Sequence, residues 1–211
     1  MTTLASARQA ASSSLVNGLM RAVSSPLVDG LVCTVLGYTL SKYLFNQTIK
    51  EMTVSHDGLL HVPAGEGLTK WVSGDEYTMK VTKAHTAGSL AFIEAIVPPG
   101  SGPIAHAHAA EDEAFYILDG ELEFLDGDRT FTGGPGDFVF IPRRRRHRFR
   151  NITGQPAKTL FLFTPGGPED LFVEGGDEPR PGEQPAPWDM ERVAQVAHLV
   201  ERTGLTVLPE S

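Results

Sequence analysis

The sequence has almost no cysteine and no excess of positive charge, and each shortage excludes a class of protein. Cys33 is the one cysteine among 211 residues, so no disulfide can form within the chain. Such cysteine usage fits a reducing cytoplasm. The formal net charge is −8, which gives no overall field that would favour nucleic acid or anionic lipid. We therefore expect a cytoplasmic protein that does not bind nucleic acid.

Long apolar runs are also missing. Residues 26–45 have about the length of a membrane span, but Asp29, Lys42 and several glycines and threonines interrupt them. Residues 1–14 lack the basic, apolar and small-residue order of a secretory signal. We expect neither a membrane span nor a signal peptide. With 41% hydrophobic and 21% charged residues, the chain has the composition of one globular domain with an appendage.

The first third of the chain has the period of helices. Apolar residues recur every four positions between 12 and 46, and Ser25-Pro26 interrupts them as a cap and first helical residue would. We expect a helical extension and linker over residues 1–65. Its wide apolar faces predict packing on the main domain or on a partner subunit. A lid or an anchor on a membrane surface is the alternative.

From about residue 67 the period changes to two. Short runs rich in β-branched and aromatic residues follow one another, and turns rich in glycine and proline separate them. Asp119-Gly120 and Asp126-Gly127 are strong hairpin signals. The pattern predicts a mainly β domain over residues 66–175, built as an antiparallel sandwich or barrel.

The C-terminal segment, residues 176–211, combines an arm and a helix. From residue 166 the chain is rich in glycine, proline and acidic residues, which indicates a surface loop or extended arm. Helical period returns over residues 188–204, where Gly204 would end the helix.

Four residues of the β domain form a candidate metal site. In a strand, alternate residues share a face, so His106 and His108 can point the same way. Glu113 follows on the next predicted strand, and His147 begins a later one. Three imidazoles and a carboxylate suit a borderline divalent ion such as Fe, Ni, Mn, Co or Zn. We predict one such transition metal, which the sequence does not identify. His56, His61, His85 and His198 have no comparable context, and we assign them no role.

Two motifs around these residues resemble the cupin signatures. The first comprises Gly100, His106, His108, Glu113 and Gly120, and the second comprises Gly136, Pro142, His147 and Asn151. Both spacings match those of the family. One position departs from it, because Arg144 stands where the second motif usually has glycine. Glycine at that place serves a tight turn, so this turn must be built differently or with strain.

Residues 68–175 are most similar to single-domain cupins of the quercetin 2,3-dioxygenase-like group. The resemblance implies a jelly-roll β-barrel, a metal held by His106, His108, Glu113 and His147, and often a homodimer. The end of the chain also resembles this group, whereas the first ~65 residues have no counterpart in it.

This resemblance favours a metal-dependent dioxygenase acting on a small aromatic or polyketide-like enol, with Glu113 as the base and dioxygen as co-substrate. One alternative is a cyclase, isomerase or decarboxylase that uses the ion as a Lewis acid. Another is a cupin that binds a small ligand without turnover. Phe115 and Phe149 share faces with the ligands and could line a substrate pocket, although packing in the barrel also explains them. Packing likewise explains Phe138, Phe140, Phe161 and Phe163.

The arginine-rich run at 142–150 could attract an acidic substrate to the barrel mouth. We instead expect these arginines to form a solvated face that pairs with the acidic residues at 169–183.

Overall fold

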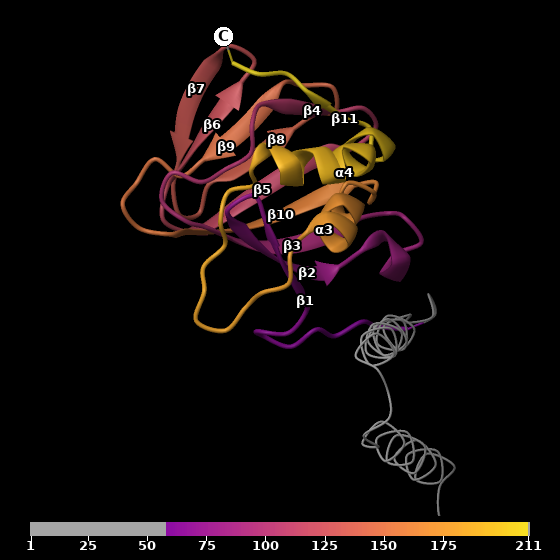
Figure 1. The fold of residues 1–211 in the computed structure, drawn as a ribbon. Helices are drawn as coiled ribbons and strands as arrows, with labels where there is room; N and C mark the ends of the chain where they lie inside the picture. The colour runs from indigo at the N-terminus through magenta and orange to yellow at the C-terminus, as the bar shows by residue number, and fades with distance from the viewer. Residues whose placement is uncertain (1–57, 211) are drawn as a thin grey trace, which may run out of the picture. The chain divides into compact units, whose positions relative to one another are not determined.

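The computed structural model describes residues 58–210, whose strands form two antiparallel sheets (Figure 1). The helices expected between residues 12 and 46 lie outside the described residues. Among residues 58–210, no helix is long and apolar enough to cross a membrane.

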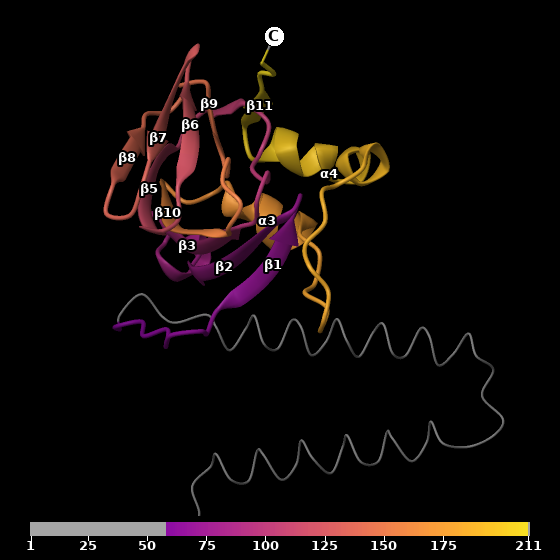
Figure 2. The same cartoon turned by 90° about the vertical axis from the view of Figure 1, so that its left-hand side faces the viewer.

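Each sheet combines strands that are distant in sequence. In order across the first sheet, the strands are β1 (Leu68–Val72), β2 (Asp75–Val81), β3 (Ala91–Val97), β10 (Ala157–Thr164), β5 (Asp112–Asp119) and β8 (Phe138–Ile141). The second sheet contains β11 (Leu205–Val207), β4 (His106–His108), β9 (His147–Arg150), β6 (Leu122–Asp126) and β7 (Arg129–Gly133). The two sheets face each other across the core (Figure 2). This arrangement confirms the predicted jelly-roll β-barrel.

Two-residue alternation gives each sheet an apolar inner face. On β3, Ala91, Ile93, Ala95 and Val97 are fully buried, while the residues between them are more exposed. Aromatic rings fill much of the space between the sheets, and Phe115 stacks on Phe161 with ring centroids 5.4 Å apart. The barrel interior is therefore filled by packed side chains, and the candidate metal ligands lie among them.

Of the two predicted hairpins, the one at Asp126-Gly127 forms, because β6 pairs with β7. The one at Asp119-Gly120 was wrong, because β5 and β6 belong to different sheets and the turn passes from one sheet to the other. Gly120 follows β5 with a φ of 75°, and a Cβ there would lie 2.8 Å from Cα of Ala157. Gly127 joins β6 to β7 with a φ of 66°. Both angles fall in the left-handed region that glycine adopts without strain.

The C-terminal region contains the expected helix and an unexpected one. Helix α4 (Met190–Arg202) begins after Asp189, whose side chain accepts a hydrogen bond from the Arg192 N–H, and it ends before Gly204. The loop expected from residue 166 is corrected, because α3 (Glu169–Gly175) forms within it. Helix α3 has only seven residues, so packing of Leu171 against α4 stabilises it more than its own sequence does. A short 3₁₀ turn, η1 (Lys83–His85), precedes β3.

Candidate metal centre

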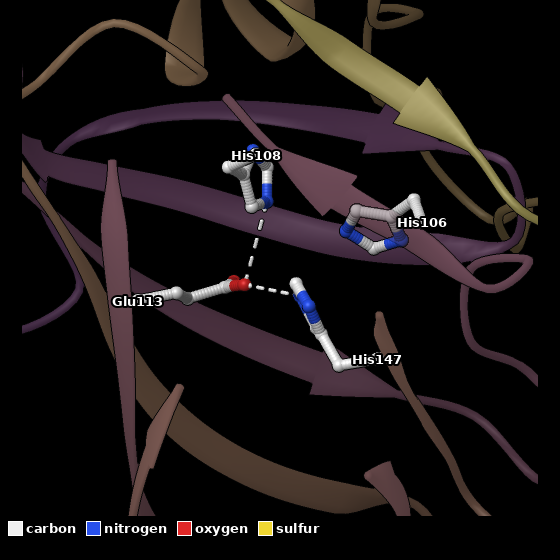
Figure 3. A group of neighbouring side chains, drawn as sticks. All are labelled: His106, His108, Glu113 and His147. Carbon is white, nitrogen blue, oxygen red and sulfur yellow. Dashed lines mark hydrogen bonds and ion pairs between the residues drawn. The ribbon is translucent and has the colours of Figure 1, made fainter. Parts of the chain in front are cut away.

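The four residues predicted as ligands come together inside the barrel (Figure 3). His106 and His108 lie on β4, Glu113 on β5 and His147 on β9. One ligand atom from each residue lies within 4.8 Å of the corresponding atoms of the other three. We call these four residues the His–Glu cluster.

The topology explains this convergence. His106 pairs directly with His147 across the antiparallel β4–β9 ladder, so their side chains are neighbours on one sheet. His108 is two residues further along β4 and faces the same interior. Glu113 comes from the opposite sheet, where β5 lies between β10 and β8. The cluster thus bridges the two sheets.

Backbone carbonyl groups orient two of the imidazoles. Nδ1 of His106 lies 2.8 Å from the carbonyl oxygen of Ile104, and Nδ1 of His147 lies 2.8 Å from that of Arg145. A carbonyl oxygen only accepts, so each Nδ1 carries the hydrogen and donates it. Each Nε2 is left for the interior of the cluster, as in histidines that hold a metal through Nε2.

The remaining contacts leave buried polar atoms without hydrogen bonds. Oε2 of Glu113 lies 2.8 Å from Nε2 of His147 and 3.5 Å from Nε2 of His108. His108 is only 3% exposed, yet neither of its ring nitrogens has a hydrogen-bond partner among residues 58–210. Buried polar atoms rarely lack a partner. The three imidazoles and the carboxylate are suitable ligands for a cation. A cation bound there would also give a His108 ring nitrogen the partner that it lacks.

Burial and contacts between the cluster residues shift their pKa values. Burial, His147 and His108 together lower the pKa of His106 to about 3. Burial alone would raise the pKa of Glu113, but the adjacent His108 and His147 hold it well below its usual range. Burial opposes protonation of His147, while Glu113 raises its pKa above the ordinary value. A neutral His106 and a charged Glu113 are the forms that bind cations.

The turn before His147 adopts the geometry that a glycine would normally provide. Arg144 has a φ of 66°, so the usual glycine conformation is retained at the cost of left-handed strain. Its backbone N–H donates to the carbonyl oxygen of His108 at 2.7 Å. Arg143 donates from its backbone and guanidinium to Asp112, the residue before Glu113. The turn therefore connects the three strands that carry the four cluster residues.

The arginines do not pair with the acidic residues at 169–183, and that expectation was wrong. Their carboxylate partners lie on neighbouring strands, in the β6–β7 turn and in the C-terminal tail, in the pairs Arg143–Asp112, Arg145–Asp126, Arg146–Asp128, Arg148–Glu123 and Arg148–Glu210. The reason is topological, because antiparallel pairing of β9 with β6 brings Glu123 and Asp126 beside the arginines.

The predicted pocket residues Phe115 and Phe149 lie in the barrel core. They contact each other with ring centroids 5.4 Å apart, and both are almost fully buried. Phe161 and Phe163 are also core residues, whereas Phe138 and Phe140 are largely exposed. The role of Phe115 and Phe149 in a substrate pocket stays a prediction.

The sequence did not indicate where an open cavity would reach the cluster. Its volume is about 420 Å³, and its lining includes His147, Phe131, Phe140, Ile141, Asp126 and Arg145. Strand β11, which pairs with β4 along His106 and His108, was likewise missed. Both features depend on which segments meet in space, and no local signal in the sequence reports that.

The barrel is similar to a known protein family and to several known proteins. The family model described as "Cupin domain" matches residues 93–163, which include all four residues of the cluster. An uncharacterized protein of Methanocaldococcus jannaschii is 41% identical over 38% of this chain and 65% of its own length. "Polyketide synthase CurC" of Streptomyces cyaneus is 36% identical over 42% of this chain and 56% of its own length. "Quercetin 2,3-dioxygenase" of Bacillus subtilis is 26% identical over 61% of this chain and 39% of its own length.

The chain spans only part of the length of these relatives. The matches span from 39% to 65% of the lengths of the three relatives.

Proposed function

Because this chain is a member of the cupin superfamily, we propose that its His–Glu cluster binds one divalent transition metal and that the protein is a metal-dependent dioxygenase. The proposed substrate is a small aromatic or polyketide-like enol. The observation that carries the proposal is the burial of three imidazoles and one carboxylate within 4.8 Å of one another. Groups of this kind are rarely buried together without a shared partner.

His106, His108, Glu113 and His147 would hold the ion. When bound, it would supply a Lewis-acidic position for an enol oxygen and, for a redox-active ion, the means to react with dioxygen. The hydrogen bonds from Nδ1 of His106 and His147 to backbone carbonyls fix those rings, so the site would need little rearrangement on loading. Iron, nickel, manganese, cobalt and zinc all suit this donor set.

Glu113 is the proposed base. Its carboxylate is buried and charged, and it lies within hydrogen-bond distance of His147. A carboxylate can accept the proton of an enol hydroxyl while the histidines keep their positions. The ring of Phe163 lies 5.1 Å from that of His108 and helps to exclude water from this side of the cluster.

Oxygen uptake tests this proposal directly. Protein loaded separately with iron, nickel, manganese or cobalt is supplied with flavonols and simpler enols in an oxygen electrode. We expect at least one metal form to consume dioxygen with an enol, and Glu113→Gln to abolish that consumption. Glu121→Gln, at an exposed turn residue outside the cluster, is the matched control. If no metal form consumes dioxygen with any enol, the dioxygenase proposal is wrong.

A non-redox enzyme is the second candidate, either a cyclase, an isomerase or a decarboxylase. It is favoured by the higher identity to a protein named as a polyketide synthase, 36% against 26% for the quercetin dioxygenase. Turnover under strict exclusion of oxygen, and turnover with zinc, would support this candidate over the first.

The homodimer and the cytoplasmic location expected from the sequence are proposals as well. Light scattering of the full chain tests the first, and fractionation of the native cells tests the second.

A further inference from the structure

We propose that the cavity beside His147 binds a planar aromatic ligand that carries an anionic oxygen group, and that Arg145 recognises this charge. The inference rests on the proposed function for the identity of the ligand as substrate. It concerns the cavity itself, so binding can be measured without turnover.

The cavity has the size and walls of a site for a small organic molecule. Its volume of about 420 Å³ falls within the range of pockets that enclose such ligands. Phe131 and Phe140 line it from the two sheets, and they are 45% and 56% exposed. Phe131 also stacks on Phe124, with ring centroids 5.4 Å apart. Flat apolar walls of this kind favour a planar ring over a flexible polar chain.

The inner part of the cavity meets the cluster at His147. This residue lines the cavity while its Nε2 contacts Glu113. A ring lying between Phe131 and Phe140 can therefore direct one oxygen substituent toward the cluster. The lining also includes Asp126 and Arg145, which form an ion pair with each other.

Arg145 has the properties needed to hold an anionic group there. Its hydrogen bond to Asp126 uses Nε, and within residues 58–210 no hydrogen bond engages its two terminal nitrogens. By contrast, Arg146 uses Nε and both terminal nitrogens in hydrogen bonds, to Leu208, Gly127, Asp128 and Pro209. Arg145 therefore lines the cavity with two terminal nitrogens that are available as donors. Guanidinium groups recognise carboxylates through such paired donors.

The surrounding charges favour an anion over a cation. The four arginines of the turn, Arg143 to Arg146, form ion pairs with three aspartates, Asp112, Asp126 and Asp128. Arg144 has no ion-pair partner within the described part of the chain, so these four arginines outnumber their ion-pair partners by one. That excess offsets the repulsion that Asp126 would exert on an incoming anion. Arg145 is also tied to the cluster, because its carbonyl oxygen accepts the Nδ1 hydrogen of His147.

A matched pair of ligands tests the inference by equilibrium binding. One is a hydroxynaphthoate whose hydroxyl and carboxylate lie on opposite rings, and the other is naphthol, which lacks the carboxylate. Calorimetry under argon is performed on full-length protein, both metal-free and zinc-loaded. We expect the hydroxynaphthoate to bind about tenfold more tightly than naphthol, as a charge-assisted hydrogen bond at a partly exposed site would give. Arg145→Gln should abolish this preference in both forms of the protein. Arg150→Gln, at an exposed arginine outside the cavity lining, should retain it.

The aromatic walls have their own control. Phe140→Ala should weaken both ligands about tenfold, whereas Phe138→Ala, two residues away on the same strand and outside the cavity lining, should change neither. Equal preference for the carboxylate in Arg145→Gln and in the wild-type protein would overturn the role of Arg145. Equal binding by Phe140→Ala and Phe138→Ala would overturn the location. A protein that consumes no oxygen but shows the expected binding pattern would refute only the dioxygenase proposal.

Discussion

Oε2 of Glu113 lies 2.8 Å from Nε2 of His147, and this contact joins the two sheets of the barrel through its interior. Glu113 belongs to β5 of one sheet, and His147 belongs to β9 of the other. Only residues that alternate inward on both strands can meet in this way. The pair therefore links the period-two pattern of the sequence directly to a site capable of binding a cation.

Removing the charge of Glu113 should weaken metal binding. Glu113→Gln keeps the shape of the side chain but deletes the anionic ligand. Removing a residue that only hydrogen-bonds to a metal ligand already lowers metal affinity about 10-fold, so we expect the affinity for zinc to fall by more than this. Competition with a chromophoric chelator measures the change. Unchanged affinity in this variant would show that the carboxylate is not a ligand, and Glu121→Gln serves as the reference for a charge lost elsewhere.

The left-handed turn at Arg144 predicts a gain in stability on substitution by glycine. Arg144→Gly and Arg144→Ala both remove the side chain, but only glycine relieves the strain at a φ of 66°. The relief of about 1–2 kcal/mol exceeds the entropic cost of glycine, so Arg144→Gly should be the more stable of the two by about 1 kcal/mol. Denaturant unfolding of both variants checks this. An Arg144→Ala protein at least as stable as Arg144→Gly would mean that the turn carries no strain.

Strand β11 should support the metal ligands from outside the cluster. Val207 pairs with His106, and Leu205 pairs with His108. Truncation after Gly204 removes this ladder, so β4 becomes an edge strand, and we expect zinc affinity to fall by about 10-fold. Truncation after Pro209 retains β11 and loses the Arg148–Glu210 ion pair. If both truncations bind zinc as the full chain does, β11 has no part in positioning the histidines.

Asp75 should make the protein less stable as the pH rises. Burial raises its pKa from 3.8 to about 6, against the neighbouring Ser101 and a hydrogen bond from Tyr77, both of which lower it. The folded state then holds a proton that the unfolded state has released, so stability is lost as the pH rises from about 4 through 6. Between about pH 4 and pH 8 this group should cost about 2 kcal/mol.

Asp75→Asn tests that pH dependence. The amide oxygen of asparagine can still accept the hydrogen bond from the Tyr77 hydroxyl, which lies 2.9 Å from the carboxylate. The difference in unfolding free energy between variant and wild type should therefore grow in favour of the variant as the pH rises. A difference that stays constant with pH would show that Asp75 titrates alike in the folded and unfolded protein.

Much of the barrel could be predicted because its strands and turns leave patterns in short stretches of sequence. Alternation along β3, β5 and β10 marks the inner face, and Asp126-Gly127 marks the β6–β7 hairpin. Asp119-Gly120 marks a turn, but this turn joins strands of different sheets. The spacing of His106 and His108 follows from the same alternation. Their grouping with Glu113 and His147 was predicted from ligand chemistry and strand pattern and was reinforced by the resemblance to cupins, although the residues lie on three separate strands.

The features that could not be predicted depend on tertiary contacts. Helix α3 forms in a segment full of glycine and proline because Leu171 packs against α4. The partners of the arginines follow from the pairing of β9 with β6, and the cavity beside His147 depends on side chains from several strands. None of these leaves a periodic or dipeptide signal in the sequence.

The metal content of the purified protein, compared between the wild type and His147→Ala, tests the central claim most directly. Elemental analysis after loading with cobalt and removal of excess ion should find about one ion per wild-type chain, with an absorption spectrum that reports nitrogen and oxygen ligands. The His147→Ala protein should retain less than about a tenth of that amount. Equal cobalt in both proteins, or none in either, would contradict a metal centre formed by His106, His108, Glu113 and His147.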